Sequence, residues 1–80
     1  MHEEFILFLK FKQLFRKKDY RGIMEIARSN QVNLSLAQFY LSSIIASTFS
    51  IEYGEEDIKK AREILAELDK ITFEPPDEIT

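Results

Sequence analysis

Cysteine is absent from the 80-residue chain, and His2 is its single histidine. Without these side chains there is no disulfide, no thiol nucleophile and none of the usual ligand sets for zinc, haem or iron–sulfur clusters. Only carboxylate chemistry is left for an enzyme. The adjacent Glu55, Glu56 and Asp57, however, point in different directions on a helix and cannot act as a paired acid and base. The sequence therefore predicts no enzymatic activity, no catalytic residue, no metal and no cofactor.

Glycine and proline are also scarce. Gly22 and Gly54 are the only such residues among the first 74, and Pro75 and Pro76 follow directly. Phosphate-binding loops need glycines that this chain lacks. So few turn residues favour helices over the frequent turns of a sheet, and we expect an all-α fold.

Four segments repeat apolar residues at the three- and four-residue spacing of helices, at about 3–17, 19–29, 34–51 and 55–71. We expect them to form one helical domain over residues 1–73, packed as two antiparallel hairpins. The acidic segment 74–80 contains both prolines and is expected to be an extended tail. Asp19 is a predicted N-cap of the second helix. Asn33 or Ser35 is a predicted N-cap of the third.

Charged side chains are absent from residues 29–51. Seven of the eighteen residues at 34–51 are serine, threonine or glutamine, and they cluster on one side of a helix, which lipid would not solvate. This pattern predicts a central helix in water and no membrane span. The first charged residues are Glu3 and Glu4, where a secretory signal carries basic ones. We therefore expect a cytoplasmic protein.

An internal repeat appears at an offset of 38 residues. It aligns Phe15 with Tyr53 and Asp19 with Asp57. Each half then consists of a helix, a turn and a second helix. Neither pair of helices can bury its apolar faces without the other, which is the logic of stacked helical repeats.

The turn Lys18-Asp19-Tyr20 resembles the Gly-Asp-Tyr turn of a tetratricopeptide repeat. Ile23 and Ala27 match the packing residues that follow it, and residues 57–61 repeat the acidic turn and the small alanine. The resemblance implies a tetratricopeptide-like arrangement of helices. It also implies a protein-binding scaffold that holds peptides or helices, as small chaperones and adaptors do.

The first helix carries more apolar side chains than one core face needs. Phe5, Ile6 and Leu9 project away from the predicted core face, and each would cost roughly 1.5–3 kcal/mol if left in water. Lys12 and Arg16 extend the same side. We predict a site for a partner helix with acidic flanks, or for a second copy of the chain in a homodimer. The alternative is that the C-terminal segment covers these side chains through Phe73 or Ile79.

Phe39 is the second candidate for partner binding, because it is the one large apolar residue among the serines and glutamine on one face of the third helix. A contact with another helix of the same chain would explain it. In the repeat interpretation, the same face would line a groove in which Phe39 contacts a ligand.

Charge is distributed unevenly along the chain. Residues 1–28 hold seven basic and four acidic groups, a net +3, whereas residues 52–80 hold four basic and ten acidic groups, a net −6. The two regions could complement each other within the molecule. In the alternative interpretation, the basic region faces an acidic partner.

Nucleic-acid binding is the alternative function, because residues 26–35 are similar to the turn of a helix-turn-helix motif. A small regulator of this kind would bind through residues 26–45. The helix that would enter the groove lacks arginine and lysine over residues 35–50, and the pI is about 5.1. A protein–protein interaction module is therefore the predicted function, with a protein rather than nucleic acid as the partner.

Overall fold

The computed structural model describes residues 2–46 and 53–73. These residues form four α-helices and no strand, which confirms the all-α fold: α1 (His2–Arg16), α2 (Tyr20–Ala27), α3 (Gln31–Ala46) and α4 (Glu55–Leu68). The predicted end of the third helix near residue 51 and the predicted extended tail at 74–80 lie outside the described residues.

A tight turn with two backbone hydrogen bonds ends α1. The backbone N–H of Asp19 donates to the carbonyl of Leu14 at 2.8 Å, and that of Lys18 donates to Phe15 at 3.0 Å. Lys18 has a φ of 63°, the left-handed conformation that glycine adopts without strain. The Asp19 carboxylate then accepts from the backbone N–H of Gly22 at 3.1 Å. The predicted N-cap of the second helix is thereby confirmed.

The third helix begins three residues earlier than predicted, at Gln31. Asn30 is the N-cap residue: its side-chain oxygen accepts from the backbone N–H of Asn33 at 2.8 Å, and its carbonyl accepts from Leu34 at 3.0 Å. Asn33 and Ser35 therefore lie inside the helix, and the prediction that one of them caps it is wrong. The apolar pattern starts at Leu34, whereas the cap that starts the helix is polar and precedes it.

The last helix begins at the predicted residue but ends three residues before residue 71. The backbone N–H groups of Lys70 and Ile71 donate to carbonyls only three residues back, at 3.1 and 3.0 Å, which tightens the last turn. Ile71 is nevertheless half-buried against the core. The apolar stripe thus continues beyond the helix, which explains the longer prediction.

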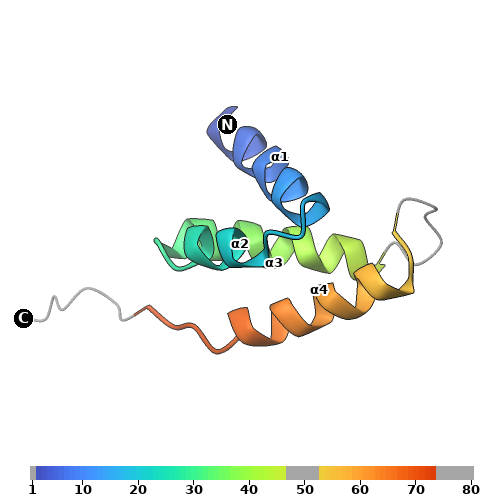
Figure 1. The fold of residues 1–80 in the computed structure, drawn as a ribbon. Helices are drawn as coiled ribbons and strands as arrows, with labels where there is room; N and C mark the ends of the chain where they lie inside the picture. Colours follow the sequence, from blue (N-terminus) through green and yellow to red (C-terminus); the bar gives the residue numbers. More distant parts are fainter. Residues whose placement is uncertain (1, 47–52, 74–80) are drawn as a thin grey trace, which may run out of the picture.

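α3 is the centre of the molecule, because it contacts each of the other three helices. It lies along α4, and α1 rises obliquely from it (Figure 1), with Leu7 and Phe8 of α1 still packed against the core. Two polar contacts connect α4 and its C-cap residue, Asp69, with the neighbouring helices. The Lys60 ammonium lies 5.2 Å from the centre of the Tyr20 ring on α2. The Gln38 amide on α3 donates to the Asp69 carboxylate at 3.1 Å.

Tyr40 on α3 is the centre of an aromatic cluster in the core. It is 2% exposed, and its ring lies 5.2 to 6.2 Å from those of Phe8, Phe11 and Phe15. Its hydroxyl is 3.3 Å from that of Tyr53, which in turn packs edge-on to Phe15. This cluster joins α1, α3 and Tyr53, which precedes α4 by two residues.

Candidate protein-binding surface

The described residues include five large apolar side chains that are exposed, and all five belong to α1 or α3. We call this set the α1/α3 apolar surface: Phe5 (64% exposed), Ile6 (64%), Leu9 (43%), Val32 (58%) and Phe39 (63%). Leaving them in water costs roughly 1.5–3 kcal/mol for each fully exposed side chain. An exposed group of this kind commonly marks a binding surface in a protein.

The exposed side chains of α1 result from the helical repeat. Phe11, Leu14 and Phe15 face the core and are buried. Because a turn contains 3.6 residues, Phe5, Ile6 and Leu9 fall on the side away from that core, as the spacing predicts. The neighbouring helices pack on the opposite side of α1 and leave these three side chains 43% to 64% exposed.

Phe39 joins the exposed side chains of α1 to the core. Its ring centre lies 5.9 Å from that of Phe8, whose own ring packs edge-on to Tyr40 at 5.2 Å. The expected contact of Phe39 with another helix of the chain is therefore present, and it is made with α1. Because the side chain is still 63% exposed, a second apolar group could pack against its outer face.

A shallow groove of about 150 Å³ lies on the other side of α1, where α1 and α3 diverge. Glu4 and Leu7 of α1 line it together with Val32, Asn33 and Leu36 of α3. Val32 was not among the residues singled out from the sequence. Its exposure depends on how α1 packs over α3, which the sequence alone does not give.

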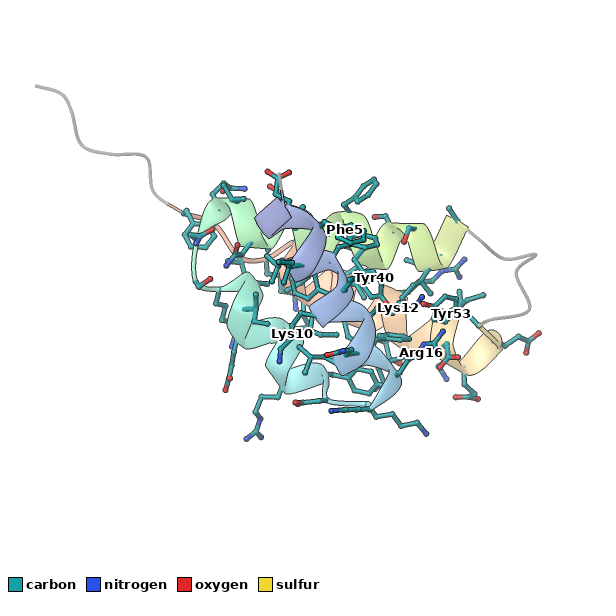
Figure 2. The ribbon with its side chains drawn as sticks, turned by 90° about the horizontal axis from the view of Figure 1, so that it is seen from above. Phe5, Lys10, Lys12, Arg16, Tyr40 and Tyr53 are labelled. Atoms are coloured by element: carbon teal, nitrogen blue, oxygen red, sulfur yellow. The ribbon has the colours of Figure 1, made fainter. Side chains whose placement is uncertain are left out.

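Basic side chains lie on both sides of the exposed face of α1. Figure 2 shows Lys10 on one side of the helix, and Lys12 and Arg16 on the other, the side of Phe5. Lys12 is half-buried, whereas Lys10 and Arg16 are exposed. Arg16 also lines a hollow of about 300 Å³ with Lys18 and residues at the start of α4. The apolar surface is therefore bordered by positive charge along α1.

Phe73 does not cover these side chains. It is half-buried against the core. The segment that follows α4 runs along the side of the molecule opposite to the N-terminal end of α1 (Figure 1). Phe5 and Ile6 are each left 64% exposed. The alternative cover, Ile79, lies outside the described residues.

Other kinds of site find less support in the described part of the chain. No group of three or more histidine, aspartate or glutamate side chains there is placed to hold a metal ion. A hollow of about 400 Å³ is lined by five residues of α4 alone, including Glu55, Lys59 and Arg62, so it is a depression along one helix. Within residues 2–46 and 53–73, no helix combines the length and apolar character needed to cross a membrane.

Comparison of the chain with protein-family models, with curated proteins and with solved structures gives no match. The exposed apolar side chains of α1 and α3 are therefore the feature of this chain that points to a function.

Proposed function

We propose that this chain is a protein–protein interaction module that binds a partner helix or peptide through the α1/α3 apolar surface. The observation that carries the proposal is the placement of every exposed large apolar side chain of the described residues on two helices that meet. α4, of nearly the same length as α1, has none. Such a concentration of exposed apolar area is what the apolar face of a partner helix can cover.

The charge around this surface defines the partner. Lys10, Lys12 and Arg16 border the exposed face of α1. A complementary helix would carry apolar anchors at i, i+3 or i+4, and i+7, with glutamate or aspartate on its flanks. Small cytoplasmic chaperones and adaptors hold segments of this kind, and we propose such a role for this chain.

The tetratricopeptide-like arrangement belongs to the same proposal. Its support is the capped turn at Lys18-Asp19-Tyr20 and the burial of the small residues Ala27 and Ala61. The two aspartates related by the 38-residue offset have different positions, since Asp19 precedes α2 as its N-cap and Asp57 lies in the first turn of α4. An exact repeat is therefore not required by the proposal.

Titration of a labelled peptide tests the proposed function. The probe is a synthetic amphipathic helix with leucine anchors and glutamate flanks, followed by fluorescence anisotropy. We expect saturable binding that weakens tenfold or more in Leu9→Asp, whereas Ala66→Asp, at an exposed position of α4, binds as wild type does. A matched peptide with lysine flanks should bind more weakly. Equal binding by wild type and Leu9→Asp would contradict the proposal.

Nucleic-acid binding is the second candidate, because only three residues, 28–30, connect α2 with α3, as in a helix-turn-helix unit. α3 contains no arginine or lysine, and five of its side chains are buried in the core. A labelled DNA duplex provides the test. Binding whose affinity falls steeply with added salt would support this candidate, whereas the peptide complex, which relies mainly on apolar contacts, should lose much less affinity.

A further inference from the structure

We propose that a second copy of this chain occupies the α1/α3 apolar surface, with the two α1 helices packed against each other in antiparallel orientation. This assignment rests on the proposed function, because it names the partner for the same surface. Two features of α1 support it. One is the separation of acidic and basic residues along the helix, and the other is the position of its exposed apolar residues along the same helix.

Charge divides α1 into two halves. Its acidic residues, Glu3 and Glu4, occupy the first turn, where Glu4 lines the groove beside α3, and its basic residues follow from Lys10 to Arg16. In a parallel pair of α1 helices, the basic halves would lie side by side and repel. In an antiparallel pair, the acidic first turn of each copy lies beside the basic half of the other, and the two helix dipoles also oppose.

The apolar residues specify the register of this pair. Phe5, Ile6 and Leu9 are centred near residue 7, so a two-fold axis at that level places Phe5 of each copy against Leu9 of the other. The same axis brings position 3 of one helix to within one residue, about 1.5 Å along the helix, of the level of Lys10 in the other. Positions 3 and 10 are seven residues apart and so share one face of the helix. Apolar and charged residues thus agree on one register.

Phe39 enlarges the contact. It lies beside α1 through its packing on Phe8 and keeps most of its ring exposed. A second α1 laid over Phe5 and Leu9 therefore meets an additional aromatic face at its edge. Because the interface is two-fold symmetric, the same side chains are buried in both copies.

Light scattering after size-exclusion chromatography, across a range of protein concentrations, tests whether the pair forms. We expect a mass of about twice the 9.4 kDa of the chain, with dissociation on dilution. Leu9→Asp should weaken the dimer by about 100-fold or more, because two buried leucines are lost per dimer. Ala66→Asp should leave the dimer intact. A dimer that is unchanged by Leu9→Asp would overturn the assignment.

Single cysteines test the orientation, since the natural chain has none. Ile6 and Gln13 are both exposed and lie on one face of α1, two turns apart. In the antiparallel pair, Ile6→Cys lies next to its own copy across the axis and should form a disulfide-linked dimer under mild oxidation. Gln13→Cys is separated from its copy by about 18 Å along the helices and should not. Equal crosslinking of both variants would show a parallel pair and overturn the proposal.

The outcomes separate this assignment from the proposed function. A chain that is monomeric at every concentration, yet binds the glutamate-flanked peptide in a Leu9-dependent way, overturns the homodimer and leaves the interaction module in place. A chain that neither dimerises nor binds the peptide through Leu9 contradicts both.

Discussion

α1 and α4 are helices of nearly equal length that use their apolar residues differently. In α4, the apolar stripe is fully used by the fold: Ala61, Ile64 and Leu68 are buried, and Ile58 and Leu65 are half-buried. In α1, the core receives Phe11, Leu14 and Phe15, and a second set of apolar side chains faces outward. The comparison shows that α4 is explained by folding alone, whereas α1 has apolar area that folding does not use.

The largest expected effect on stability comes from a substitution in α4, whose apolar residues are used by the fold. Leu68 is fully buried at the end of α4, so Leu68→Asp places an unpaired charge in the core. We expect a loss of about 4 kcal/mol or more in the free energy of unfolding, enough to unfold a small domain. Circular dichroism with urea titration measures it. A folded variant close to wild type in stability would show that α4 does not form the core.

Tyr40 provides a second test, because it connects α1 with the rest of the core. Tyr40→Leu removes the ring that contacts Phe8, Phe11 and Phe15, and leaves the Tyr53 hydroxyl without this partner. We expect a loss of about 3 kcal/mol. Tyr40→Phe keeps the ring and should cost only about 1 kcal/mol, from the hydroxyl contact. Equal losses in the two variants would argue against the aromatic cluster as the source of stability.

The turn after α1 gives an effect of about 1 kcal/mol in each direction. Asp19→Ala removes the cap of α2 and should lower the free energy of unfolding by about 1 kcal/mol. Lys18→Gly relieves a left-handed conformation and should raise it by about 1 kcal/mol. Thermal unfolding of both variants beside wild type checks the signs. A destabilised Lys18→Gly would mean that the turn does not have the observed conformation.

Much of this fold follows from local patterns in the sequence. Sparse glycine and proline with regular apolar spacing indicate four helices, and Asp19 caps α2 as its position suggests. The start of α3 was mispredicted because its N-cap, Asn30, precedes the first residue of the apolar pattern. The helical spacing also predicts which residues of α1 face the core and which face outward, because both sets follow from the same period of 3.6 residues.

Contacts between helices were harder to predict. The burial of Tyr40 was not predicted, although the buried residues Leu34, Ala37, Leu41 and Ile44 lie near it on the same helix. A tyrosine can be buried only where its hydroxyl finds a partner, and that partner, Tyr53, lies thirteen residues away. Val32 escaped notice for a similar reason, because its exposure depends on how far α1 and α3 diverge. Such features require the tertiary structure.

The central claim is that Phe5, Ile6 and Leu9 do not stabilise the folded chain and are available for a partner. The most direct measurement is the free energy of unfolding of the triple variant Phe5→Ser, Ile6→Ser and Leu9→Ser, compared with wild type at a concentration where both are monomeric. We expect the two values to agree within about 1 kcal/mol, as for surface substitutions. A loss of about 4 kcal/mol or more, the size expected from core side chains, would contradict the claim and assign these residues to the fold.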